Sequence, residues 1–177
     1  MTHINPALHV QTDSDRGSSL IETMAAMALL LIVMAGLMSM DAVATTSTEN
    51  YGHLGARTAE YAQDKMEQLL ALAWGDEVSD TTVFPATNAG GTGLLVGGSW
   101  NVAAPVAGYV DYLDQDGRLL VSVGGAAPAG WYYKRVWSVA SPVANLKQIT
   151  VSVTTAIGFG RAQPPVATVA ALKSFPF

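Results

Sequence analysis

The sequence contains no cysteine among its 177 residues. It can therefore form no disulfide framework, no thiolate metal site and no thiol nucleophile. Histidine is almost as scarce, because only His3, His9 and His53 occur, and two of the three lie within the first seventeen residues. The usual pairs of a nucleophile and a histidine base cannot be assembled from this inventory. We expect a protein that is not an enzyme and that uses no cofactor.

Charged residues are also few, at 13% of the chain, and the formal net charge is −5. A small net negative charge without a cluster of lysine and arginine gives no reason to expect nucleic acid as a partner. The scarcity is greatest in residues 23–40, which contain no charge at all. At 1.5 Å per residue, a helix of this length would span about 27 Å, close to the roughly 30 Å hydrocarbon core of a bilayer. Residues 18–40 are therefore predicted to form a transmembrane helix.

Proline is absent between Pro6 and Pro85, so nothing ends this helix at the membrane boundary. Residues 41–74 are expected to continue it as an amphipathic helix. The helix is expected to bend or melt most easily near Thr45, Gly52 and Gly55, because these residues have low helix propensity. Apolar and small side chains recur at spacings of three and four, which predicts a packed face. They are Leu54, Thr58, Tyr61, Ala62, Met66, Leu69, Leu70 and Ala73. The polar residues between them are expected to face water: Arg57, Glu60, Asp64, Lys65, Glu67 and Gln68.

Residues 75–177 change to a pattern typical of β-structure, after a glycine-rich stretch with loop character. Strands are predicted at residues 109–113, 118–123, 131–139 and 148–155, with Asp116 and Gly117 in a hairpin turn between the first two. Residues 168–173 are expected to add a short edge strand. The predicted fold class is α+β, with one face of a small antiparallel sheet laid on the long helix.

Two groups of side chains in this part could bind a ligand. Asp111, Asp114 and Asp116 supply oxygen ligands around a tight turn and are weak candidates for calcium, although a solvated hairpin tip explains them better. Trp131, Tyr132, Tyr133 and Trp137 could form a platform that stacks on carbohydrate, but aromatic pairs between strands are the preferred interpretation. Alternation along a strand would place Tyr132 on the face opposite Tyr133 and Trp137.

The acid at the entrance of the apolar run, Glu22, needs a partner, because charges inside a membrane are costly. The sequence Gly17-Ser18-Ser19-Leu20-Ile21-Glu22, followed by the long apolar helix, resembles the type III signal of type IV pilins and type II secretion pseudopilins. The resemblance implies a leader of residues 1–17, cleavage by prepilin peptidase between Gly17 and Ser18, N-methylation of Ser18, and subunit docking by Glu22. The new amine of one chain could then pair with Glu22 of its neighbour.

The family's usual mid-helix proline is absent, with Gly36 and Ser39 in that region, which points to a minor pilin or pseudopilin. The long helix, the Asp-x-Asp-Gly meander at residues 114–117 and the stretches 131–137 and 146–153 resemble PilV-type minor pilins and I-type pseudopilins. Ser18 also departs from the usual phenylalanine. The resemblance implies a type IV pilin-like fold, an inner-membrane anchor with a periplasmic C-terminal domain, and later a place in a pilus or pseudopilus at the cell surface. Expected partners are prepilin peptidase, other pilins, the inner-membrane assembly platform and the lipid bilayer.

Such a subunit would prime or cap assembly. Two alternatives stay open. One is a secretory signal peptide with its core between Met24 and Met38, cleaved near Ala42. The other is a single-span membrane-anchored binding or adhesin domain that is never cleaved.

Overall fold

The computed structural model describes residues 15–157 and 163–175, with side chains from Ser19 onward. The chain divides into two compact units, Met1–Thr46 and Ser47–Phe177. A single α-helix, α1 at Asp15–Ala71, contributes to both units. The predicted long helix is confirmed, and it ends three residues before the expected position.

In the first unit, α1 exposes apolar side chains on every side. Each large apolar side chain from Leu20 to Val43 is between 48% and 73% exposed. By length and composition, the segment Ser19–Ala71 contains a window that could cross a membrane. A helix that is apolar all round needs an apolar environment from outside its own chain.

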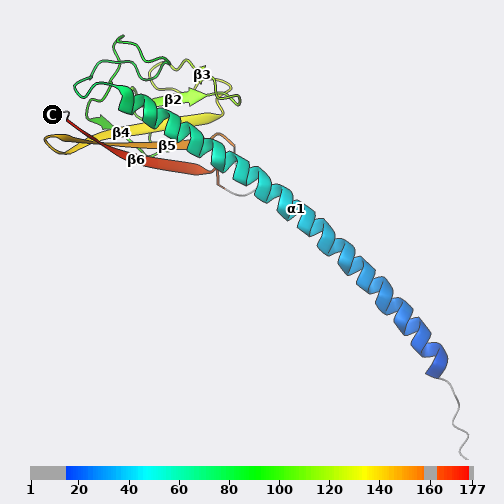
Figure 1. Ribbon diagram of the computed structural model, residues 1–177. Helices are drawn as coiled ribbons and strands as arrows, with labels where there is room; N and C mark the ends of the chain where they lie inside the picture. Colours follow the sequence, from blue (N-terminus) through cyan, green and yellow to red (C-terminus); the bar gives the residue numbers. More distant parts are fainter. Residues whose placement is uncertain (1–14, 158–162, 176–177) are drawn as a thin grey trace, which may run out of the picture. The chain divides into compact units, whose positions relative to one another are not determined.

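The second unit contains an antiparallel sheet whose main strand order is β3-β2-β4-β5-β6 (Figure 1). The α+β fold class is confirmed, and so is the edge position of the last strand. The strands are β1 (Gly97–Gly98), β2 (Val110–Leu113), β3 (Leu119–Leu120), β4 (Tyr133–Val143), β5 (Leu146–Thr155) and β6 (Val166–Ser174).

Strand β1 was not predicted from the sequence, because two glycines were interpreted as part of a loop. It pairs with β4 through Gly97↔Val139 and Gly98↔Ser138. The backbone here passes close under an aromatic ring, since a Cβ on Gly98 would lie 2.6 Å from a ring carbon of Tyr109. Gly98 also has a φ of 79°, so glycine is needed both for space and for conformation.

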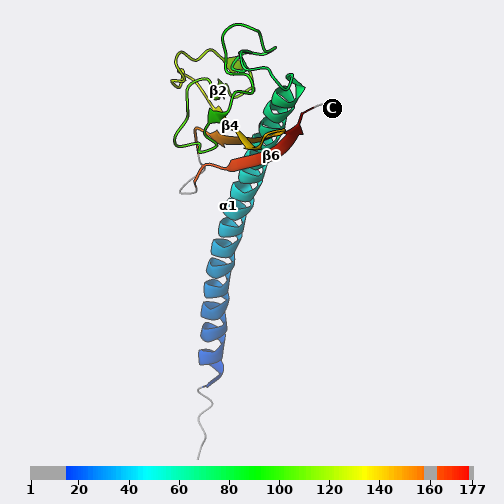
Figure 2. The same ribbon diagram turned by 90° about the vertical axis from the view of Figure 1, so that its left-hand side faces the viewer.

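The main core lies between one face of the sheet and residues 47–71 of α1, which cross that face in both ribbon views (Figures 1 and 2). Trp137 is fully buried and pairs across strands with Val151. From the helix, Ala62, Met66 and Leu69 complete this cluster. The stripe predicted from helical spacing is therefore largely confirmed.

Two members of that stripe differ from the expectation. Ala73 lies beyond the end of α1 and is exposed, and Leu70 is 36% exposed. Lys65 differs in the opposite sense, because it was expected to face water and is fully buried. Its spacing from Thr58 and Ala62, seven and three residues, places it on the buried face of the helix. The expectation of a solvated Lys65 was wrong because residue type was given more weight than periodicity.

A smaller core cluster covers the other side of β2 and β4, where Val110, Tyr112 and Val136 pack with the half-buried Trp131. The rings of Tyr112 and Trp131 have centroids 5.7 Å apart. Tyr132 was expected to lie opposite Tyr133, but it packs against the main core, with ring centroids 4.9 Å from Tyr133. It precedes the first residue of β4, so strand alternation does not govern it.

Lysines from the last two strands bind carbonyl groups at the C-terminal end of α1. The Lys173 ammonium donates to the carbonyls of Leu70 and Leu72 at 2.5 and 2.7 Å. The Lys147 ammonium donates to the carbonyl of Trp74 at 3.0 Å. The last turn of the helix has no basic residue of its own. Cations supplied by the sheet therefore satisfy carbonyls that a helix end leaves free.

Candidate functional site

The predicted cleavage bond lies near the start of α1. Gly17 and Ser18 fall within the helix bounds Asp15–Ala71, and side chains are described from Ser19 onward. The remainder of the predicted leader, residues 1–14, lies outside the described residues. Helical backbone therefore runs directly from the predicted cleavage bond into the apolar segment.

Glu22 is exposed and lies between exposed apolar side chains, with Ile21 at 71% exposure and Met24 at 67%. Among the side chains that the structure describes, none forms an ion pair with Glu22. The first lysine or arginine that follows is Arg57. A carboxylate at this position in a membrane requires a cation from elsewhere.

The neighbouring Thr23 hydroxyl has its hydrogen-bond partners within the helix, because it donates to the carbonyls of Ser19 and Leu20 at 3.0 and 2.9 Å. Ser39, the other hydroxyl side chain of the apolar run, donates to the carbonyl of Gly36 at 2.8 Å. Neither hydroxyl group therefore needs a hydrogen-bond partner outside the helix. Glu22 is left as the group in the described apolar segment that calls for an external partner.

In the second unit, Asp111 lies at the centre of a charge cluster, defined as the buried Lys65, Asp111 and Arg135 together with the half-exposed Asp64. The Lys65 ammonium is 2.7 Å from Asp111 Oδ2. The Arg135 guanidinium donates two hydrogen bonds to the same carboxylate, of 2.6 Å to Oδ1 and 2.8 Å to Oδ2. Its third contact is to Asp64 Oδ2 at 2.8 Å. The cluster joins α1 to β2 and β4.

Burial and charge oppose each other in this cluster. Burial lowers the pKa of Lys65 to about 8, although the Asp111 carboxylate opposes that shift. Burial alone would raise the pKa of Asp111, but Lys65 and Arg135 together hold it below its ordinary value. The Lys65 ammonium also lies 4.3 Å from the centroid of the Trp137 ring and donates to the carbonyl of Thr81. The buried charges are thus paired and hydrogen-bonded.

The three weak calcium candidates have different surroundings. Asp111 is engaged by the two cations of the charge cluster. Asp114 Oδ1 accepts hydrogen bonds from the backbone of Asp116 and Arg118, at 2.9 and 2.8 Å, and so closes the β2–β3 turn. Asp116 is exposed and lies 3.9 Å from Arg118. Among described residues, no three histidine or acidic side chains are grouped to hold a metal ion.

Comparison with protein families identifies the N-terminal segment. The description "Prokaryotic N-terminal methylation motif" matches residues 13–38. The chain carries a type IV pilin-like prepilin signal. Comparison with curated proteins and with solved structures gives no match.

The prepilin signal places the predicted cleavage bond, Glu22 and most of the apolar run inside one recognised motif. It supports the pilin and pseudopilin family, processing by prepilin peptidase and assembly with other pilins. Together with the apolar helix, it supports a membrane-anchored protein. The motif ends at residue 38, so it carries no information on the sheet.

Sequence reasoning missed the charge cluster of the second unit. Asp111 was considered as a calcium ligand, and Lys65 and Arg135 were not connected with it. One signal was available, because Lys65 falls on the apolar stripe of the helix. The pairing partners could not be inferred, since they depend on the register Asp111↔Arg135 between β2 and β4.

Proposed function

We propose that this protein is a minor type IV pilin or pseudopilin that primes or caps assembly of a pilus or secretion pseudopilus. The observation that carries the proposal is the methylation motif over residues 13–38, on a helix that exposes apolar side chains on every side. In this proposal prepilin peptidase cuts between Gly17 and Ser18 and methylates the new amine. The first unit then anchors the chain in the inner membrane, and the second unit lies in the periplasm until assembly.

Glu22 is proposed to dock subunits. It lies in an apolar segment and has no described cationic partner, so the methylated amine of a neighbouring subunit would supply the missing charge. The minor role rests on the absence of proline from residues 23–40, where Gly36 and Ser39 lie in the second half of the run. The sheet contributes the domain that neighbouring subunits would contact.

The N-terminus decides between this proposal and its main alternative. The chain would be produced with and without an active prepilin peptidase, and its intact mass and N-terminal peptide measured. We expect a mature chain that begins at N-methyl Ser18 when the peptidase is present, and the uncut chain when it is absent. An intact leader in both cases would instead support an uncleaved membrane-anchored binding domain. Cleavage near Ala42 would indicate a secretory signal peptide.

The docking role is tested separately with Glu22→Ala. We expect normal cleavage, because the bond between Gly17 and Ser18 does not involve Glu22, and a large loss of incorporation into filaments isolated from the cell surface. Thr23→Ala is a matched control, since it alters a neighbouring polar residue that is satisfied within the helix. Normal incorporation of Glu22→Ala would remove the docking role and leave the processing proposal intact.

A further inference from the structure

Strand β6 has one open side along its whole length. Its nine residues all pair with β5, from Leu146↔Ser174 to Thr154↔Val166. In the sheet order it is the terminal strand, and no strand among the described residues pairs with its other side. Figures 1 and 2 both show β6 as the outermost strand of the sheet.

The pairing register identifies the backbone groups that face outward. The amide of Phe175 donates to the carbonyl of Asn145 at 3.0 Å, and the register continues without a shift along β6. In an antiparallel ladder, bonded pairs alternate, so residues 167, 169, 171 and 173 bond to β5. The amides and carbonyls of residues 166, 168, 170, 172 and 174 therefore point to the open side.

Exposed edge strands usually carry features that prevent another strand from pairing with them, such as charges, prolines or bulges. Strand β6 has none of these along residues 166–172, because Pro164 and Pro165 precede it and the pairing contains no bulge. Its one charged residue is Lys173, whose ammonium is bound to the carbonyls of Leu70 and Leu72. The open edge of β6 is thus long, carries no free charge, and lacks the features that usually prevent another strand from pairing.

The two faces beside this edge are also incompletely covered. Towards the helix, Val169 and Ala171 are only half-buried against the main core. On the other face, Leu172 is 63% exposed beside a hollow of about 350 Å³ that Gln148 and Ala170 help to line. One more strand, paired with β6 in the plane of the sheet, would place side chains beside these residues on both faces.

We propose that the open side of β6 accepts an extended strand from a partner protein. The row of outward amides and carbonyls is complementary to another extended backbone, and strand addition at a sheet edge is a known mode of peptide recognition. The half-buried residues toward the helix call for apolar side chains at alternate positions of the partner. The absence of a free charge on β6 calls for an uncharged strand. This inference depends only on the second unit and stands apart from the proposed function.

A capped synthetic peptide of residues 148–155 is a suitable probe. It has the sequence of the strand that already pairs with β6, it is uncharged, and its apolar residues alternate. The detergent-solubilised full chain would be titrated with this peptide. Hydrogen exchange at single backbone amides would be measured by mass spectrometry. We expect slower exchange at Thr168, Ala170 and Leu172, by about fivefold or more for each new hydrogen bond. The amides of Val169 and Ala171, already bonded to β5, should not change.

Proline substitutions test the outward groups directly. Ala170→Pro removes an outward amide without breaking a bond to β5, so the sheet should stay folded and peptide protection should disappear. Leu172→Pro makes the same test at a second outward position, in case one variant does not fold. Ala170→Val is the matched control, because it keeps the amide and should keep the protection.

Three results would overturn the proposal. The first is the absence of slower exchange up to the solubility limit of the peptide. The second is protection that survives in folded Ala170→Pro and Leu172→Pro. The third is protection of the outward amides that depends on chain concentration without any peptide, which would show that a second copy of this chain, and not a partner's strand, occupies the edge.

Discussion

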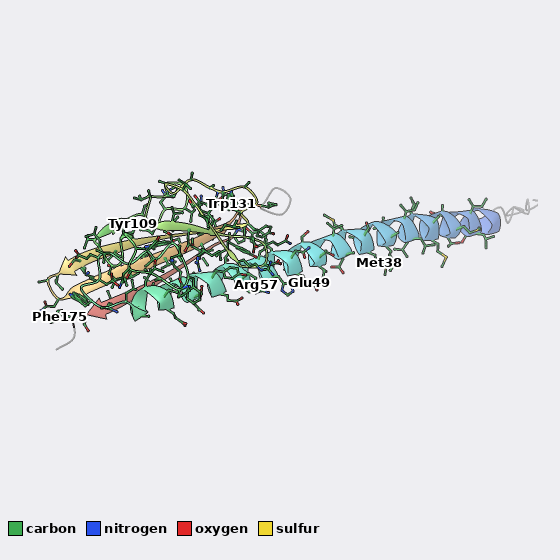
Figure 3. The ribbon with its side chains drawn as sticks, turned by 90° about the horizontal axis from the view of Figure 1, so that it is seen from above. Met38, Glu49, Arg57, Tyr109, Trp131 and Phe175 are labelled. Carbon is green, nitrogen blue, oxygen red and sulfur yellow. The ribbon has the colours of Figure 1, made fainter. Side chains whose placement is uncertain are left out.

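Residues 19–46 and residues 47–71 belong to one continuous helix, but their side chains meet different surroundings. In the first segment, all large apolar side chains are exposed, and two charged residues, Glu22 and Asp41, lie among them. In the second, apolar side chains and Lys65 are buried against the sheet. Figure 3 shows the side chains of both segments, with Met38 labelled in the first and Arg57 in the second.

The difference shows that two separate sources of stability act on the same helix. The second segment is held by contacts within its own chain, including paired charges, whereas the first needs an apolar environment from outside its own chain. Substitutions in the second segment should therefore change the stability of the isolated protein. Substitutions in the first should change membrane insertion or assembly, and leave the folded domain unaffected.

The largest effect is expected for Asp111→Ala. It would leave Lys65 and Arg135 buried without their shared carboxylate, at a cost of about 3–5 kcal/mol in the free energy of unfolding. Urea unfolding of the full chain in detergent, followed by tryptophan fluorescence, measures this change. Asp64→Ala is the control, since Asp64 is half-exposed and should contribute less than about 1 kcal/mol. A loss for Asp111→Ala as small as the one expected for Asp64→Ala would show that the buried cluster does not hold the helix on the sheet.

The same substitution placed in both segments tests the comparison most directly. Met66 is 7% exposed in the main core, and Met34 is 48% exposed in the apolar run. Met66→Ala should lower the free energy of unfolding of the second unit by about 2–5 kcal/mol, because it leaves a cavity. Met34→Ala should leave it unchanged in detergent, as measured by the same urea titration. A comparable loss for Met34→Ala would contradict the separation of the two segments.

The sequence predicted the features that depend on periodicity or on a local motif. The apolar run, the alternation of β5 and the acid at Glu22 are all visible within a few neighbouring residues. The buried charge cluster could not be predicted, because Lys65 meets Asp111 only when strand order and register bring β2 beneath the helix. The short strand β1 was missed for a similar reason, since Gly98 is required by the Tyr109 ring that covers it and not by a turn.

The altered pKa of Lys65 predicts how the stability of the second unit depends on pH. Lys65 titrates at about 8 in the folded chain and at about 10.5 when unfolded. Between these values the unfolded chain binds more protons, so the contribution of Lys65 makes the free energy of unfolding rise with pH. Unfolding titrations from pH 7 to pH 10.5 would measure this rise, and Lys65→Met should remove it. A fall with pH in the wild type that Lys65→Met abolishes would show that the Lys65 ammonium is stabilised by the cluster.

The smallest effect is expected at the C-terminal end of the helix. Lys173→Met removes an ammonium that donates to the carbonyls of Leu70 and Leu72 but keeps most of the side-chain length. The free energy of unfolding should fall by about 1 kcal/mol, because Lys147 still binds the carbonyl of Trp74. Amide exchange should increase in the last turn of α1 and stay unchanged near Ala62, where the helix is packed on the sheet. An equal increase at both places would mean that Lys173 stabilises the second unit as a whole and not the helix end.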